Sequence, residues 1–252
     1  MTKEPGAALA RVLLVEDDVS IARFIEMALE DQGLELTVCT DVESALAVLK
    51  DGPVQLIISD LMLPGLSGYD LLDRLHAEPA LVAGAKVVIF SAGLGAGKPA
   101  ELEGRGVWRV LSKPASVVQL LACVSDALAQ RSDSPASQSA VAPPAPGLDS
   151  SEDAAIAAYF DGNTALFLAY RAKCLAQFAN DLAVGDAALR SGDLPALQRL
   201  SHSLSTVFCT LGWAQDGRTA KALESRAAEG DAQAAAIAWG KLRARLLNGG
   251  LA

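Results

Sequence analysis

Residues 56–65, Leu-Ile-Ile-Ser-Asp-Leu-Met-Leu-Pro-Gly, form an apolar run that ends at Asp60 and is followed at once by a turn. A short apolar run without polar alternation is typical of a strand that is buried on both faces of a parallel sheet. Pro64 and Gly65 are typical turn residues. The stretch therefore places the carboxylate of Asp60 at the mouth of a sheet and not on a solvated face.

A second apolar run, residues 12–15, ends in the acidic residues Glu16, Asp17 and Asp18. In a doubly wound sheet, ligands bind beyond the carboxyl ends of the strands. Carboxylate oxygens that two strand ends bring together suit a hard cation. The two runs therefore predict a site for such a cation and a phosphoryl group.

The first half of the chain alternates apolar runs with amphipathic stretches, which indicates an α/β domain. We expect strands over residues 11–16, 34–39, 54–59, 85–90 and 107–111. We expect helices over residues 18–33, 41–51, 66–78, 98–104 and 114–130. Asp41 and Ser67 are candidate helix N-caps, and Gly33 and Gly52 are candidate helix stops.

The second half of the chain has no strand pattern. We expect helices over residues 151–159, 163–190, 194–211, 213–229 and 231–247. Long helices with short connections indicate an antiparallel bundle. Residues 131–150 hold four prolines and no apolar periodicity, which predicts a linker that could span roughly 60 Å if extended. The sequence thus predicts an α/β domain over residues 1–130, a linker over 131–150 and an all-α bundle over 151–252.

Composition narrows the function classes. The net charge is −9, and residues 1–130 hold 10 basic against 18 acidic residues. Because no basic stripe is present, nucleic-acid binding is not expected. No apolar run approaches the roughly 20 residues that cross a bilayer, and the N-terminus does not resemble a signal peptide, so we expect a cytoplasmic protein without a membrane partner. The four cysteines lack metal or disulfide spacing and are expected to be buried small hydrophobes.

Five side chains of the first domain fall at expected strand ends and suit phosphoryl transfer: Glu16, Asp17, Asp60, Ser91 and Lys113. Acidic oxygens and a backbone carbonyl suit Mg²⁺, and a carboxylate can act as the nucleophile. A hydroxyl and an ammonium would stabilise the equatorial oxygens of the transferring group.

Residues 10–130 resemble a response-regulator receiver domain. The segments that carry the resemblance are LLVEDD, LIISDLMLPGLSGYDLL, VVIFSA and LSKP. The resemblance implies a flavodoxin-like doubly wound (βα)5 fold. It also implies that Glu16 and Asp17 hold Mg²⁺, with Asp60 and the backbone carbonyl of Met62 completing the set. Asp60 would accept the phosphoryl group, and Ser91 and Lys113 would contact it.

One position departs from the receiver pattern. The family usually carries an aromatic residue three positions before the lysine, where this chain has Val110. The aromatic residue changes rotamer when the hydroxyl residue engages phosphate, and a valine cannot make that change. Trp108 is expected two residues earlier on the same side of the strand.

His202 is the candidate reactive residue of the second domain. The helix expected over residues 194–211 has a core stripe of leucine and phenylalanine residues, namely Leu197, Leu200, Leu204, Phe208 and Leu211. His202 lies about 160° from the centre of this stripe at 100° per residue, so we expect it to face solvent. An exposed imidazole that is partly neutral can attack a phosphoryl group. An incidental surface histidine is the alternative.

The segment LSHSLSTVFCTLGW resembles the phosphorylated helix of a histidine phosphotransfer (HPt) domain. His202 agrees with that pattern, whereas Ser205 replaces its lysine and Thr206 its glycine. We hypothesise that Arg199 supplies the missing positive charge. His76, the other histidine, is expected to be an ordinary surface residue.

Together these features predict a phosphorelay protein. The receiver would accept a phosphoryl group at Asp60 with Mg²⁺ from a sensor or hybrid histidine kinase and catalyse its own phosphorylation. The HPt domain would exchange the group through His202 with the receiver domain of a response regulator. Internal transfer from Asp60 to His202 is one option, and regulation of access to His202 by phosphorylation of the receiver is the other. The alternative is a regulatory interaction protein whose degenerate bundle only binds partners. A kinase is not expected, because the only P-loop-like segment, residues 92–98, is followed by Pro99.

Overall fold

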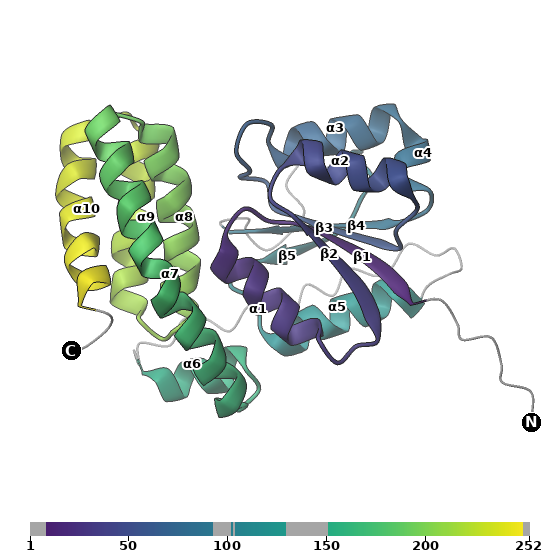
Figure 1. Cartoon of the computed structure of the whole chain (residues 1–252), viewed down its shortest axis with the longest axis horizontal. Coiled ribbons are helices and arrows are strands. Elements are labelled where there is room, and N and C mark those ends of the chain that lie inside the picture. The colour runs from purple at the N-terminus through teal and green to yellow at the C-terminus, as the bar shows by residue number, and fades with distance from the viewer. Residues whose placement is uncertain (1–8, 93–101, 103, 130–150, 249–252) are drawn as a thin grey trace, which may run out of the picture.

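A computed structural model describes residues 9–92, 102, 104–129 and 151–248 of the chain. Two bodies lie side by side, an α/β domain and a bundle of helices (Figure 1). In the described residues, the α/β domain contains a five-stranded parallel sheet with the strand order β2-β1-β3-β4-β5. The fold is therefore the predicted doubly wound receiver-type α/β fold, followed by the predicted helical bundle.

The described elements of the α/β domain follow one another in the expected alternation. The strands are β1 (Ala10–Val15), β2 (Leu34–Cys39), β3 (Leu56–Ser59), β4 (Lys86–Ser91) and β5 (Val107–Ser112). The helices are α1 (Val19–Leu29), α2 (Val42–Asp51), α3 (Gly68–Ala77), α4 (Pro79–Val82) and α5 (Val117–Ala129). The side chains of Asp41 and Ser67 accept N-cap hydrogen bonds, as expected.

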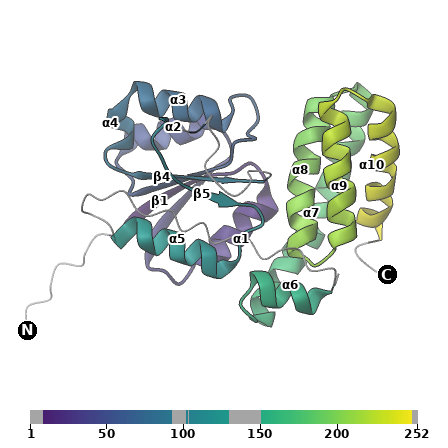
Figure 2. The same cartoon turned by 180° about the vertical axis from the view of Figure 1, so that it is seen from behind.

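Helices cover both faces of the sheet, with α1 and α5 on one face and α2, α3 and α4 on the other (Figures 1 and 2). Alternate residues of each strand therefore enter different apolar clusters. In β1, Val12 and Leu14 pack toward α1 and α5, whereas Leu13 and Val15 pack toward α2 and α3. Burial on both faces explains why the strands read as unbroken apolar runs.

The second body is built from α6 (Glu152–Tyr159), α7 (Thr164–Ser191), α8 (Leu194–Thr210), α9 (Ala214–Ala228) and α10 (Ala232–Leu247). Helices α7 to α10 pack as neighbours around a common core, and α6 lies at one end (Figure 1). The connection between α7 and α8 shows how the sequence sets the breaks. Gly192 has a φ of 72°, which ends α7, and the side chain of Asp193 then caps the start of α8.

A few segments differ from expectation or lie outside the described residues. The helix expected over 66–78 is followed by a separate short helix, α4, because Pro79 cannot continue α3 but can start a new helix. The linker expected over 131–150 lies outside the described residues, as do the P-loop-like segment apart from Ala92 and most of the helix expected over 98–104. Within the described residues, no helix combines the length and hydropathy that a membrane crossing requires.

Strand β5 contains an irregularity that corrects the expectation for Trp108. Val87 and Val88 of β4 are paired with Val107 and Arg109, so the register skips Trp108. This bulge places Trp108 with the cluster under α1 and α5, whereas Val110 packs on the opposite face. Trp108 and Val110 are therefore on different sides of the sheet, and Trp108 does not take the place of the aromatic residue that Val110 replaces.

Candidate functional site

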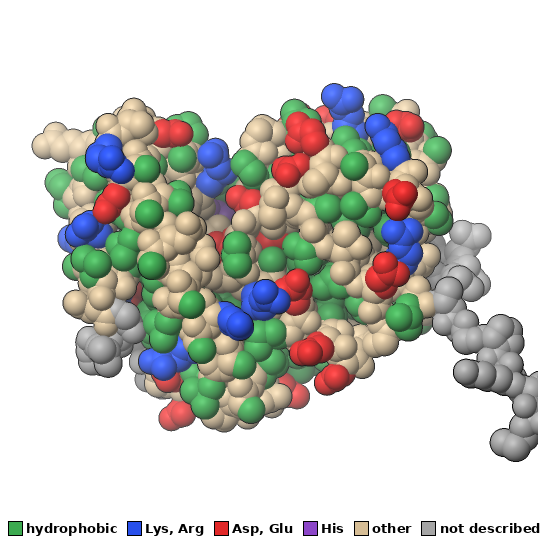
Figure 3. All heavy atoms as spheres, viewed as in Figure 1, with side chains coloured by type: hydrophobic (Ala, Val, Ile, Leu, Met, Phe, Trp, Pro, Cys, Tyr) green, Lys and Arg blue, Asp and Glu red, His purple; other side chains and the backbone are tan. Residues whose placement is uncertain are grey.

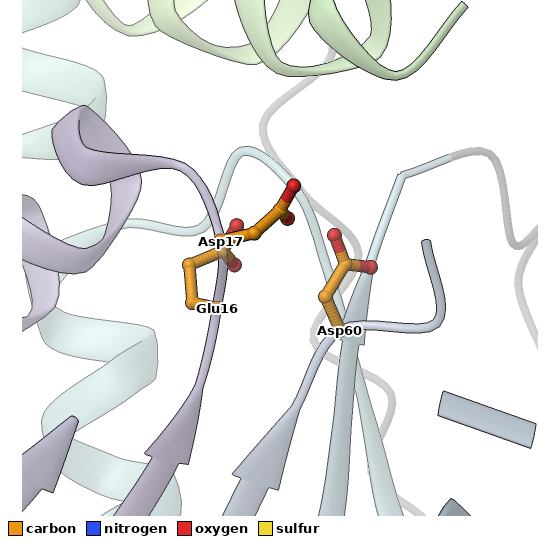
Figure 4. Close-up of side chains that lie close together, drawn as sticks. All are labelled: Glu16, Asp17 and Asp60. Atoms are coloured by element: carbon orange, nitrogen blue, oxygen red, sulfur yellow. The ribbon is translucent and has the colours of Figure 1, made fainter. Parts of the chain in front are cut away.

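Three carboxylates meet at the carboxyl ends of β1 and β3. Glu16 and Asp17 follow β1 and Asp60 follows β3, and ligand oxygens of the three lie within 4.8 Å of one another. Figure 4 shows these side chains at the strand ends, with a helical ribbon of the second body on the far side of the space that Asp17 and Asp60 face. Glu16 and Asp60 are buried and Asp17 is half-buried. Clustered carboxylates of this kind are the donor set that a divalent cation takes.

Lys113 lies against this cluster from the end of β5. Its ammonium group is 2.6 Å from Glu16 Oε2 and 2.8 Å from Asp60 Oδ2, and its side chain is fully buried. The other oxygen of Asp60 accepts a hydrogen bond of 2.6 Å from the backbone N–H of Leu61. Ser91 is buried at the end of β4, and its carbonyl accepts a bond from the N–H of Lys113. The predicted residues of the first domain therefore lie together.

The electrostatics of the cluster favour a bound cation. Burial raises the pKa of Glu16 well above its usual value, although Lys113 opposes this. Burial, together with the charge of Asp60, raises the pKa of Asp17 to about 6. Burial also acts to raise the pKa of Asp60, but the charge and hydrogen bond of Lys113 hold this pKa below its usual value. One ammonium thus balances three carboxylates, and a cation would offset the remaining negative charge.

The position of Asp60 depends on a close approach by α3. A Cβ atom added at Gly68, the first residue of α3, would lie 2.1 Å from the backbone oxygen of Asp60. The N–H of Gly68 donates to the carbonyl of Leu61. Only glycine allows the helix to begin this close to the strand end, so Gly68 helps fix the loop that carries Asp60.

The structure corrects the prediction that His202 faces solvent, because its side chain is only 4% exposed. His202 does lie off the core stripe of its own bundle, but the residue pattern of one helix does not show what covers that side. The covering groups are α9 and the α/β domain. His202 Nδ1 lies 3.0 Å from Glu224 Oε1 of α9. Among the described residues, His202 Nε2 is buried without a hydrogen-bond partner.

The bond to Glu224 assigns the protons on the imidazole. Burial acts to raise the pKa of Glu224, but hydrogen bonds from His202 and Lys221 hold it below its usual value. An ionised carboxylate only accepts hydrogen bonds, so Nδ1 must be the donor. In the neutral imidazole the lone pair then lies on Nε2. Lys221 of α9, with its ammonium 2.8 Å from Glu224 Oε2, provides positive charge in this cluster.

The neighbours of His202 on α8 face in two directions. The hydroxyl of Ser205 donates to the carbonyl of Gly217 on α9, 3.2 Å away. Thr206 is buried and faces the α/β domain, where it borders the same small gap as Phe24 and Pro114. Arg199 is half-buried, and its proposed role stays a prediction.

His202 and the acidic cluster lie next to each other. Ser203, the residue after His202, lies beside Asp18, the residue after Asp17. A positive charge on His202 is also close enough to lower the pKa of Asp60. In the space-filling view, acidic side chains lie in the notch between the two bodies (Figure 3). The structure therefore brings the candidate residues of both domains to one place.

Comparison with known proteins identifies the first domain. Residues 12–125 match the response regulator receiver domain family. The N-terminal domain is a response regulator receiver domain. Its acidic pocket implies phosphoaspartate signalling, and receiver domains in general have histidine kinases as partners. The second domain remains a helical region whose kind these matches do not identify.

The similar curated proteins match over the receiver domain. The DNA-binding response regulator MtrA of Mycolicibacterium paratuberculosis is 31% identical over 135 residues, which are 52% of this chain and 57% of MtrA. The sensory transduction protein RegX3 of Mycobacterium bovis is 38% identical over 73 residues, which are 29% of this chain and 32% of RegX3. The chain therefore covers less than two thirds of these relatives. A putative response regulator from Chloroflexus aurantiacus is a similar solved structure, with 29% identity, a TM-score of 0.45 and coverage of 48% of this chain and 99% of that one.

Sequence reasoning missed Glu224 and Lys221. They lie one turn apart on α9, and Glu224 contacts a histidine 22 positions earlier on another helix. No spacing pattern within one helix links these positions. The one signal in the sequence is that Glu224 follows the apolar Leu223 on the side of α9 that faces the core, where an acidic residue is unusual.

Proposed function

We propose that this chain is a phosphorelay protein in which Asp60 and His202 exchange a phosphoryl group. The proposal is supported chiefly by one observation, which is that α8 packs against α1 of the receiver with His202 close to Asp60. The unpartnered Nε2 of His202 and the buried carboxylate of Asp60 would be the two phosphoryl-carrying atoms. MtrA is DNA-binding by name, but the match to it gives no reason to extend that activity to the bundle.

The first step would load the receiver. A carboxylate oxygen of Asp60 attacks the phosphorus of a donor such as a phosphohistidine of a sensor or hybrid histidine kinase. The N–P bond breaks as the O–P bond forms, and the donor imidazole leaves with its electron pair. Lys113, which already contacts Asp60, would move its hydrogen bond to an oxygen of the transferred group. Ser91, at the end of the neighbouring strand, would contact a second oxygen.

The second step would load the bundle. The lone pair on Nε2 of His202 attacks the phosphorus of the acyl phosphate, the O–P bond breaks, and the carboxylate of Asp60 leaves as an anion. Glu224 holds the Nδ1–H and stabilises the positive charge that develops on the ring. From His202 the group would pass in the same way to the receiver domain of a response regulator.

Glu16, Asp17, Asp60 and the backbone carbonyl of Met62 would hold Mg²⁺. The observation in favour of this fit is the set of three clustered carboxylates with a single ammonium to balance them. The bound ion would neutralise phosphoryl oxygens during transfer. The chain's own residues position the reacting atoms and exclude water from them.

The test uses radiolabelled acetyl phosphate with Mg²⁺, because this small donor requires no identified kinase. In the unchanged protein, we expect label of two kinds: a base-labile acyl phosphate at Asp60 and a base-stable phosphohistidine at His202. His202→Gln should keep only the base-labile label, and Asp60→Asn should keep neither. His76→Gln is the matched control, since His76 is exposed on α3.

The proposal fails if the unchanged protein gives only the base-labile label and no phosphorylated receiver labels His202. That outcome would favour the alternative, in which the bundle binds partners without carrying phosphate. An unlabelled Asp60 in the presence of Mg²⁺ would instead contradict the assigned phosphoacceptor.

A further inference from the structure

The receiver and the bundle share an apolar contact that is centred on Phe24 of α1. The ring of Phe24 lies 5.6 Å from the ring of Phe160 and 5.5 Å from the ring of Tyr170, both in edge-on arrangements. Phe160 follows α6 and Tyr170 lies on α7, so one receiver side chain enters an aromatic cluster of the bundle. Figures 1 and 2 both show α1 beside the bundle.

Polar residues extend this interface from Phe24 toward the N-terminus of α1. Ser20 on α1 and Cys174 on α7 are both buried and lie beside each other. Ser203 of α8 lies beside Asp18, as described above. Contacts over successive turns of α1 fix the direction in which the bundle lies, and they place His202 over the acidic pocket.

The interface is closely packed. Side chains of both domains, among them Ile21, Phe90 and Thr206, border a residual cavity of about 10 Å³. A cavity of this size is at the lower limit for a single water molecule. The apolar cluster under α1 and α5 continues without a break into the core of the bundle. The small volume of the cavity and the shared apolar cluster indicate a specific contact between the two domains.

We propose that the α1 face of the receiver is a docking surface whose resident partner is the bundle of the same chain. This docking in cis shields His202 and Asp60 from other proteins, so phosphoryl exchange between them occurs within one chain by default. The inference rests on the proposed function and adds the identity of the partner. Covalent connection supports it, because a tethered domain has an effective concentration near the millimolar range, well above that of most free competitors.

The test measures exchange between two full-length chains. The donor carries His202→Gln, so that it holds phosphate only at Asp60, and the acceptor carries Asp60→Asn, so that it holds phosphate only at His202. In both chains the contact between receiver and bundle is intact, so each bundle covers the Asp60 pocket of its own receiver and each receiver covers its own position 202. We therefore expect slow transfer between chains.

Two further substitutions separate the domains within each chain but leave intact the two surfaces that must meet between chains, the α1 face of the donor and the bundle face of the acceptor. Tyr170→Asp in the donor frees its receiver but leaves its α1 face intact. Phe24→Asp in the acceptor frees its bundle but leaves the bundle face intact. We expect transfer between this released pair to be at least about tenfold faster, which corresponds to a loss of 1.4 kcal/mol of docking.

Two controls isolate the interface. Leu168→Asp places the same charge on α7 at an exposed position, and in both chains it should leave transfer slow. Exchanging the two releasing substitutions, with Phe24→Asp in the donor and Tyr170→Asp in the acceptor, damages both faces that must dock. That pair should show no acceleration.

Small-angle X-ray scattering without phosphate separates this proposal from the proposed function. Phe24→Asp and Tyr170→Asp should each increase the radius of gyration, with unchanged circular dichroism, and Leu168→Asp should not. An unchanged radius in both variants, or transfer that is measurable but equally fast in the released and unreleased pairs, overturns docking in cis. A larger radius with no phosphate on His202 in any pair would leave the docking intact and refute the relay.

Discussion

Removal of the Glu224 carboxylate should slow phosphoryl transfer to His202 without unfolding the protein. Glu224 accepts the Nδ1–H of His202 at 3.0 Å, and it is only partly exposed. A hydrogen bond to a charged group contributes about 1.5–3 kcal/mol. If that contribution is lost when the ring becomes positive in the transition state, Glu224→Ala should slow transfer by roughly 10- to 150-fold. Glu224→Gln keeps a hydrogen-bond acceptor without the negative charge, so its transfer rate should lie between those of the unchanged protein and Glu224→Ala.

The assay is rapid-quench measurement of the rate at which label passes from Asp60 to His202. Glu229→Ala is the control, because Glu229 ends the same helix at an exposed position where it pairs with Arg226. Its rate should match that of the unchanged protein.

A spectroscopic measurement separates positioning from a merely structural role. The chain has two histidines, and His76 is exposed. In ¹⁵N NMR, neutral His202 should show a single tautomer with the proton on Nδ1, whereas Glu224→Ala should show a mixture like that of His76. Unchanged transfer in Glu224→Ala, or an unchanged His202 spectrum, would refute the reasoning.

Three other predictions follow from buried groups. Gly68→Ala should destabilise the receiver by about 2 kcal/mol or more in urea unfolding, because the new Cβ meets the backbone oxygen of Asp60. The control is Gly240→Ala, at an exposed helical position with open space, which should instead stabilise the protein by roughly 0.5–1 kcal/mol. Burial raises the pKa of Asp181 from 3.8 to about 7, so ionisation of this group increasingly opposes folding as the pH rises through that range and reaches its full cost above pH 7. Asp181→Asn should therefore leave stability unchanged near pH 4 and increase it by up to about 4 kcal/mol at pH 8, and an equal gain at both pH values would contradict this. Addition of Mg²⁺ should raise the melting temperature of the unchanged protein, and EDTA should reverse the increase; Asp17→Asn should lose most of this response if Asp17 is a ligand.

The receiver was largely predictable from local pattern. The apolar runs that end at Asp60 and at Glu16 are strands buried on both faces, and parallel strands end at one edge of a sheet. Their topology alone therefore brings the acidic residues together with Lys113. The boundaries of the bundle helices were also accessible, since Gly192 and Asp193 stop one helix and cap the next.

Features that depend on a second element could not be predicted in this way. His202 was expected to be exposed because its helix was considered alone, whereas the receiver and α9 cover it. The side on which Trp108 lies depends on a skipped pair between β4 and β5, which leaves no mark in the β5 sequence. Glu224 contacts His202 through the packing of α8 against α9, and no periodicity encodes a contact between two helices at that position.

The apolar cluster that runs from the receiver into the bundle has a consequence for how the chain unfolds. Phe24, Phe160 and Tyr170 belong to the same buried cluster as the inner residues of both domains. Heat or denaturant that melts one half should therefore expose part of the core of the other, and calorimetry should show one cooperative transition in place of two. A receiver produced without residues 151–252 would present Phe24 to water, and such fragments should self-associate at concentrations where the intact chain is monodisperse.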